Sequence, residues 1–63
     1  MRYVIHFQTA TESEPQKAVI EAADVRRALL MVKMKMAPER IVSVIDANGS
    51  QYDASGEALT SLN

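Results

Sequence analysis

The sequence contains no cysteine, and this absence removes two ways in which very small proteins are stabilised. A chain of 63 residues buries only about 60% of the surface of its unfolded state, so we expect a net stability of a few kcal/mol. Without cysteine, neither a disulfide framework nor a thiolate metal site can supplement the core. The absence also fits a reducing compartment, and we expect a cytoplasmic protein.

The residue types that build catalytic and ligand sites are also scarce. His6 is the only histidine, so a zinc site with two histidines is excluded. The only glycines, Gly49 and Gly56, precede no expected helix, which excludes a phosphate-binding glycine loop. Glu12, Glu14, Asp46 and Asp53 lie in expected loops or hairpin ends. Acidic residues are common at such positions because they stabilise turns, so we expect no enzymatic activity, cofactor or metal.

Charge and hydropathy argue against two further classes of protein. Seven Lys and Arg residues against eight Asp and Glu residues give a net charge of -1, so bulk charge does not recruit nucleic acid. No apolar run approaches the roughly 20 residues that a membrane span needs. His6 and Gln8 interrupt the segment that would have to be the apolar part of a signal peptide. The composition, 48% hydrophobic and 24% charged, is that of a globular domain.

The longest periodic segment, residues 24–36, predicts one amphipathic helix. Asp24 occupies the N-cap position, and the helix is expected over residues 25–36. At about 100° per residue, four apolar side chains form one buried stripe with Ala28 at its edge. These four residues are Val25, Leu29, Val32 and Met36. Pro38 ends the helix, because proline disfavours helical geometry in the residue before it.

Two strands are predicted before this helix. Residues 2–9 alternate in polarity, and Tyr3, Ile5 and Phe7 share the face that should point into the core. Residues 10–15 are polar, end in proline and predict a loop. Residues 16–22 predict a second strand with its alanines and Ile20 inward, although one continuous helix over residues 16–36 is a competing interpretation.

Two more strands are predicted after the helix. Residues 41–45 (I-V-S-V-I) have the strongest strand composition, but their pattern does not decide which side chains face the core. Asn48-Gly49 predicts a two-residue hairpin turn, because both residues accept positive φ, and a short strand over residues 50–53 should follow. Residues 54–63 contain small polar residues and two leucines, which predicts a flexible tail.

These elements predict an α+β fold of two layers. One helix should pack on a small antiparallel sheet of three or four strands in the order β-β-α-β-β. Residues 1–53 would form this single domain, with no internal repeats. The second face of the sheet would carry Val4, His6, Val19 and part of the third strand.

The outward face of the helix is the candidate site for a partner. Opposite the buried stripe lie Arg26, Arg27, Leu30, Met31, Lys33 and Met34. Arg26 and Arg27 lie in the first helical turn, where positive charge interacts unfavourably with the helix dipole. Leu30, Met31 and Met34 have no reason to face water if the helix is covered on one side only. In one interpretation the helix is broad-faced, with Leu30 and Met31 flanking the core. In the other, adaptable Met and Leu side chains ringed by cations bind a protein with an acidic rim.

The order of elements resembles that of small phage-encoded inhibitors of bacterial RNA polymerase found in T-odd podophages. The residues that carry the resemblance are residues 21–29 (E-A-A-D-V-R-R-A-L), Pro38 and residues 41–45, within a match over roughly residues 2–46. That family has acidic residues where this chain has Arg26 and Arg27. The resemblance implies a protein without an active site that acts by occupying the surface of a host enzyme such as RNA polymerase.

The chain also resembles the HicB-like antitoxins, which open with a similar strand and carry an E-E-A-L helix. This sequence lacks the glycine-rich segment expected between their strands and the appended DNA-binding domain. Both resemblances imply small size and function through a partner's surface.

Three hypotheses for function follow from the outward helix face. The leading one is a small non-enzymatic module or inhibitor, of phage or mobile-element origin, that binds a host protein. The second is a nucleic-acid-binding module that uses Arg26, Arg27, Lys33 and Lys35, although the chain has few aromatic residues on which bases could stack. The third is a homodimer that buries Leu30, Met31 and Met34 against a second copy.

Overall fold

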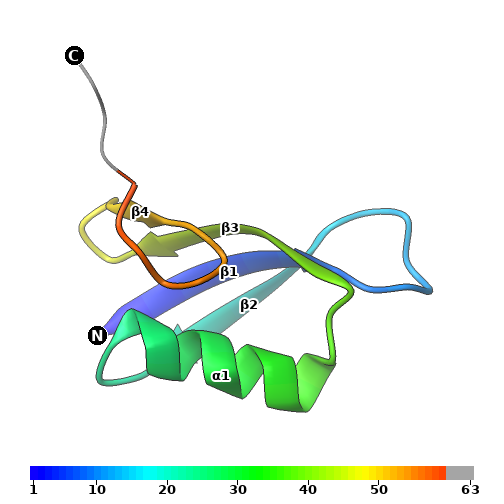
Figure 1. The fold of residues 1–63 in the computed structure, drawn as a ribbon, viewed down its shortest axis with the longest axis horizontal. Coiled ribbons are helices and arrows are strands. Elements are labelled where there is room, and N and C mark those ends of the chain that lie inside the picture. The colour runs from blue at the N-terminus through cyan, green and yellow to red at the C-terminus, as the bar shows by residue number, and fades with distance from the viewer. Residues whose placement is uncertain (60–63) are drawn as a thin grey trace.

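The computed structural model describes residues 1–59 and places one helix against one face of a four-stranded sheet (Figure 1). The elements are β1 (Arg2–Gln8), β2 (Gln16–Glu21), α1 (Val25–Met36), β3 (Arg40–Asp46) and β4 (Gln51–Tyr52). The predicted α+β class and the β-β-α-β-β order are therefore confirmed. The bounds of α1 are those predicted, whereas each strand differs from its predicted range by one residue at one or both ends.

The strands lie in the order β2-β1-β3-β4, and every neighbouring pair is antiparallel. β1 is central because β2 returns along one side of it and β3, after the helix, along the other. Ile5 of β1 lies opposite Ala18 of β2 and Val44 of β3, and all three side chains are buried. The helix packs on the β1 and β2 side of this face.

The core lies between α1 and the inner face of the sheet. Its buried apolar residues are Tyr3, Ile5, Phe7, Ala18, Ala28, Leu29, Val32 and Val44. The prediction that alternate residues of the first strand point inward is confirmed. The ring of Tyr3 meets the ring of Tyr52 edge to face, with centroids 6.3 Å apart, so aromatic packing joins β1 to the short strand β4.

A bulge in β3 explains why its sequence did not reveal its inward face. His6 lies opposite Ser43 and Phe7 lies opposite Ile41, so Val42 has no partner on β1. One extra residue shifts the alternation of side chains by one position. Ile41 and Val44 therefore both pack on the core side, which an unbroken alternation does not allow.

The helix begins and ends with defined caps. Asp24 has extended backbone angles, and its carboxylate accepts a hydrogen bond from the N–H of Arg27 at 2.8 Å, as an N-cap does. Ala37 ends the helix in the left-handed conformation, with φ 45° and ψ 55°. The predicted stop at Pro38 is correct, but the residue before the proline is left-handed and not extended.

The predicted buried stripe of the helix is wrong at one end. Leu29 and Val32 are buried and Val25 is half-buried against the core, as expected, but Met36 is 44% exposed. Met36 is the last residue of α1, and the chain reverses at Ala37, so no further helical turn covers it. Ala28, which was expected at the edge of the stripe, is fully buried.

The hairpin between β3 and β4 has a three-residue loop and not the predicted two-residue turn. The N–H of Gly49 donates to the carbonyl of Asp46 at 3.0 Å, and the N–H of Asp46 donates to the carbonyl of Ser50 at 3.0 Å. Gly49 has φ 85°, whereas Asn48 does not have positive φ. A loop of this length has one left-handed position, and glycine fills it without strain.

A second turn, after β4, repeats the first. The N–H of Gly56 donates to the carbonyl of Asp53, and the N–H of Asp53 donates to the carbonyl of Glu57. Gly56 has φ 93°. The two segments read D-A-N-G-S (residues 46–50) and D-A-S-G-E (residues 53–57). The chain thus uses the same short turn motif twice.

The second turn lies within the predicted tail and packs on the helix. A Cβ atom on Gly56 would lie 2.9 Å from Cγ of Arg26 and 3.6 Å from a methyl group of Leu29. Ala58 then bridges Tyr52, and the N–H of Leu59 donates to the carbonyl of Gln51 at 2.8 Å. Residues 54–59 are therefore hydrogen-bonded to the domain that was expected to end at residue 53. The flexibility of the tail stays a prediction, and residues 60–63 lie outside the described part of the chain.

Candidate functional site

The outward face of α1 is exposed along its length. Of the six residues predicted to bind a partner, Leu30 and Met34 are 56% and 76% exposed. Arg26, Arg27 and Lys33 are also exposed, whereas Met31 is half-buried. Leu30 and Met34 are one helical turn apart, so their side chains are neighbours on the surface. The structure therefore brings five of the six residues onto the outer surface and leaves Met31 at its margin.

The charges on this face are only partly explained by helix stability. α1 has no acidic residue in its first turn, where Arg26 and Arg27 lie, and it has Lys33 and Lys35 in its last turn. Cations near the C-terminal end interact favourably with the helix dipole, by about 0.3–1 kcal/mol each, and cations near the N-terminal end interact unfavourably. The two arginines thus carry a small energetic cost that the isolated helix does not offset.

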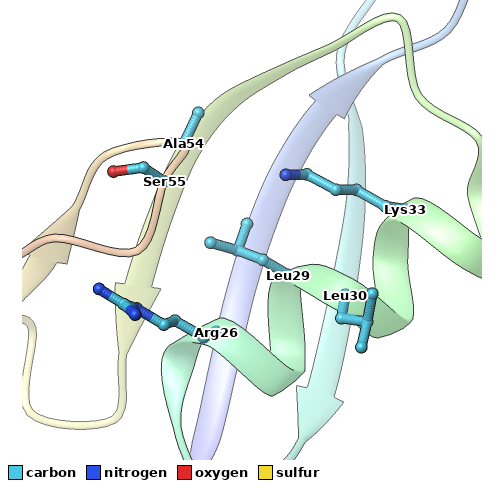
Figure 2. Close-up of a pocket in the computed structure, with 6 residues that line it drawn as sticks. All are labelled: Arg26, Leu29, Leu30, Lys33, Ala54 and Ser55. Carbon is cyan, nitrogen blue, oxygen red and sulfur yellow. The ribbon is translucent and has the colours of Figure 1, made fainter.

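A groove runs between α1 and the second turn, with a volume of about 240 Å³. Its lining residues are Arg26, Leu29, Leu30, Lys33, Ala54 and Ser55. Figure 2 shows Leu29 directed toward the turn, with Arg26 and Lys33 on either side of it along the helix. The groove therefore has an apolar floor between two cationic side chains.

The sequence prediction missed the second wall of this groove. Ala54 and Ser55 were assigned to the tail, and Leu29 was assigned to the core alone. The repeated D-A-x-G pattern is the signal that could have revealed the turn, because it copies a recognisable hairpin loop. Which helix residue the turn would contact could not be read from the sequence.

The second face of the sheet carries Val4, His6, Val19 and part of β3, as predicted, and no described element covers it (Figure 1). Val4 lies between Val19 of β2 and Ile45 of β3, which gives an apolar row across three strands. His6 follows on the same face, and its Nδ1 atom is 3.1 Å from the hydroxyl oxygen of Ser43. His6 lies opposite Lys17 on its other side, so the single histidine is placed among polar neighbours of the sheet surface.

Asp46 has a structural role that accounts for its position. It is the one polar residue that is buried in the described chain. One carboxylate oxygen accepts hydrogen bonds from the N–H groups of Asn48 and Ser50, at 2.9 and 3.0 Å, and the other accepts from the hydroxyl of Tyr52 at 2.9 Å. Burial opposes ionisation, but these hydrogen bonds outweigh it and hold the pKa of Asp46 below its ordinary value. The same contact raises the pKa of Tyr52.

Asp53 closes the second turn in the same way. Its carboxylate accepts from the hydroxyl of Ser55 at 2.6 Å and from the N–H groups of Ser55 and Glu57 at 2.9 and 3.1 Å. The hydroxyl of Ser55 makes the largest contribution to lowering the pKa of this carboxyl group. Both turn aspartates are thus occupied by hydrogen bonds within their own turns, as expected for turn carboxylates.

Residues 1–59 contain no cluster of metal ligands and no membrane-spanning helix. Among residues 1–59, no three His, Asp or Glu side chains are grouped so that they could hold a metal ion. No helix in this part of the chain is long and apolar enough to cross a membrane. Comparison with known protein families, with curated proteins and with solved structures finds no match to this chain.

Proposed function

We propose that this protein is a small binding module that uses the outward face of α1 to hold a protein partner. The observation that carries the proposal is the exposed pair Leu30 and Met34 among three cationic side chains. An exposed Met and Leu pair on a helix adapts to differently shaped apolar surfaces, and the cations favour a partner with carboxylates around its contact. The partner segment is thus apolar at its centre and acidic at its edge.

The groove beside α1 supports this assignment. It forms a hollow beside Leu30 with the buried Leu29 at its floor, and it places Arg26 and Lys33 where they would meet carboxylates of the bound segment. Its volume of about 240 Å³ is small for a drug-sized ligand, whose pockets are about 300–1,000 Å³. It is large enough to receive one or two side chains of a protein. Anchor side chains of this kind contribute much of the affinity of protein interfaces.

The cysteine-free composition and the resemblance to phage inhibitors favour action in the cytoplasm on a bacterial enzyme. Purified bacterial RNA polymerase is therefore the first partner to test, by direct binding to the wild-type protein and to two variants. Met34→Asp places a charge at the centre of the contact and should abolish binding. Arg27→Glu should weaken it and reduce its dependence on salt.

Val42→Asp is the matched control, because it places the same charge on another exposed apolar residue, which lies on β3 and not on α1. Binding that survives Met34→Asp but is lost in Val42→Asp would move the contact to the bulged strand and contradict the proposal. If RNA polymerase does not bind, the wild-type protein and the three variants should be compared by affinity capture from the native host.

Nucleic acid is the alternative partner, and its binding is tested with the same wild-type protein and with an arginine variant. Arg26, Arg27, Lys33 and Lys35 are all exposed. Binding through them to phosphates predicts a steep loss of affinity with salt, and an Arg26→Glu/Arg27→Glu variant should lose both the binding and its salt slope. Loss of protein binding in Met34→Asp, with no binding of nucleic acid by the wild-type protein even at low salt, favours a protein partner.

A further inference from the structure

β2 is an exposed sheet edge in the described part of the chain. It pairs with β1 on one side, and no residue among 1–59 pairs with its other side. At the far end of the sheet the edge is different, because Ala58 bridges Tyr52 of β4. β2 contains no proline, and its pairing with β1 has no bulge. These are two of the features by which sheet edges avoid pairing with other strands, and β2 has neither.

The backbone of β2 offers a regular set of hydrogen-bonding groups at this edge. The N–H of Ala22 donates to the carbonyl of Met1 at 3.0 Å, and the N-terminal amine of Met1 donates to the carbonyl of Ala22 at 2.8 Å. In an antiparallel pair the direction of these groups alternates along the strand. The N–H and C=O groups of Lys17, Val19 and Glu21 therefore point away from β1, toward the free edge.

The side chains of the same three residues are self-complementary in charge. The strand reads K-A-V-I-E over residues 17–21, so Lys17 and Glu21 are equally far from Val19 and share the open face of the sheet. An antiparallel copy with Val19 opposite Val19 would place each Lys17 against the Glu21 of the other copy. Cross-strand pairs of opposite charge stabilise a sheet, and like charges in direct opposition destabilise it.

Charge also selects this register over its neighbours. A pairing centred on Lys17 or on Glu21 places two like charges opposite each other. A pairing centred on Ala18 or on Ile20 leaves Lys17 and Glu21 without opposite charges across the edge. Only the register centred on Val19 matches both charges and uses the outward peptide groups of all three residues.

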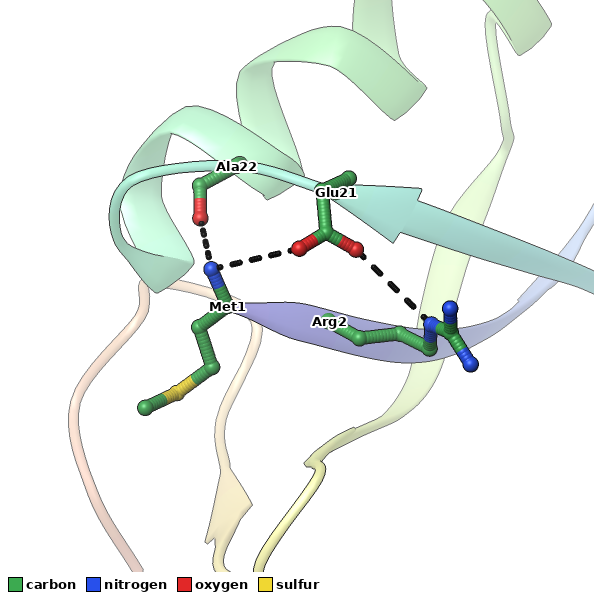
Figure 3. A network of polar contacts seen from close by, with 4 residues as sticks. All are labelled: Met1, Arg2, Glu21 and Ala22. Atoms are coloured by element: carbon green, nitrogen blue, oxygen red, sulfur yellow. Dashed lines mark hydrogen bonds and ion pairs between the residues drawn. The ribbon is translucent and has the colours of Figure 1, made fainter.

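Glu21 can make this additional contact. Figure 3 shows its carboxylate between the N-terminal ammonium of Met1 and the guanidinium of Arg2, with N–O distances of 3.6 and 3.7 Å. These separations are long for charge-assisted hydrogen bonds, and the Glu21 side chain is 71% exposed. Its carboxylate oxygens therefore have free positions for a lysine from a second copy.

The apolar row on the open face also continues across this edge. Val19 is 55% exposed and lies next to Val4, which lies next to Ile45. In the register centred on Val19, the two copies of Val19 meet, and the row runs without interruption from Ile45 of one copy to Ile45 of the other. The contact thus covers the most exposed end of the row.

We propose that β2 is a dimerisation edge at which a second copy of this chain pairs antiparallel, with Val19 on the two-fold axis. The product is one continuous eight-stranded sheet with both α1 helices on the same face. This surface is separate from the outward face of α1, so the dimer presents that face twice. The two assignments can therefore fail independently.

Reciprocal charge variants test the edge. The wild-type protein should have twice the 7.0 kDa mass of one chain in sedimentation or light scattering, with dissociation on dilution. Lys17→Glu and Glu21→Lys each place like charges at positions 17 and 21, which face each other across the two copies. Each variant should therefore weaken the dimer roughly tenfold or more. An equimolar mixture of the two variants restores opposite charges at every position and should recover the dimer. Arg40→Glu, on β3 and outside both proposed surfaces, makes the same change of charge and should leave the mass unchanged.

Amide exchange identifies the pairing directly. In the dimer the N–H groups of Lys17, Val19 and Glu21 should be protected from exchange with solvent, and in Lys17→Glu they should exchange rapidly while those of Ala18 and Ile20 stay protected. A wild-type protein that is monomeric up to millimolar concentration overturns the proposal. So does a dimer that both charge variants retain, because its contact lies elsewhere.

Discussion

The carboxylate of Asp46 and the hydroxyl of Tyr52 lie 2.9 Å apart and join the two strands of the last hairpin. The contact is part-buried, and the other oxygen of Asp46 is bound to the backbone of the loop between them. A single side chain therefore fixes the loop and anchors the ring of Tyr52, which packs on Tyr3 of the central strand. The hairpin is tied to the core through this pair.

Removal of the Asp46 carboxylate should destabilise the protein more than removal of its counterpart in the second turn. Asp46→Ala leaves two backbone N–H groups and the hydroxyl of Tyr52 without partners in a partly buried region. Asp53→Ala exposes its donors to water. We expect the fall in free energy of unfolding to be roughly twice as large for Asp46→Ala, measured by urea denaturation. Equal losses would show that the burial of Asp46 is energetically unimportant.

Stability should fall in acid because of the same two carboxyl groups. The folded protein lowers the pKa of both Asp46 and Asp53, so their ionised forms favour folding. A lowered pKa gives stability that is complete above the ordinary aspartate value, near 4, and is lost as the pH falls below it. Urea midpoints should be nearly constant from pH 5 to pH 7 and should decrease between about pH 4 and pH 2. Asp46→Asn should flatten this decrease.

The two repeated turns allow a matched comparison of glycine substitutions. Gly49 and Gly56 both have positive φ, but a Cβ atom on Gly49 meets no atom within 4 Å, whereas one on Gly56 meets Arg26 at 2.9 Å. Gly49→Ala should cost about 1 kcal/mol for its backbone conformation alone. Gly56→Ala should cost about 1 kcal/mol more, because the Arg26 side chain or the turn must shift to make room for the methyl group. Similar losses would indicate that the second turn does not pack on α1 in solution.

Replacement of Ala37 by glycine should stabilise the protein. Ala37 is the only non-glycine residue with positive φ in the described chain, and its left-handed conformation is strained for a residue with a Cβ atom. Ala37→Gly should raise the free energy of unfolding by about 0.5–1 kcal/mol, after the greater entropy of glycine in the unfolded chain is taken into account. Ala10→Gly, in an exposed loop with ordinary φ, should be neutral or destabilising. Thermal unfolding of both variants measures the difference.

Much of the fold could be predicted from local pattern. Strand alternation around Ile5 and the capping position of Asp24 each depend on a few neighbouring residues, and both predictions are confirmed. The bulge at Val42 could not be predicted, because it depends on how β3 pairs with β1 across a long stretch of chain. The exposure of Met36 likewise depends on where the chain turns away from the sheet.

The candidate surfaces likewise divide into one that local sequence pattern predicts and two that depend on contacts between distant parts of the chain. Helical periodicity was sufficient to place Leu30 and Met34 outside the core. The groove was missed because it requires the second turn to fold back on Leu29, which is a contact between distant parts of the sequence. The free edge of β2 was missed because the order of strands in the sheet decides which strand is outermost.

The loop between β1 and β2 has a practical consequence for every experiment on this protein. Residues 10–15 are all exposed, and they join two strands that pair without interruption. An affinity tag or fluorophore inserted near Glu12 would be attached to neither the helix face nor the outer edge of β2. It would also leave the amine of Met1 free for its contacts with Glu21 and Ala22, which a tag on that amine would remove. The loop is therefore the place at which this domain can be labelled, immobilised or fused.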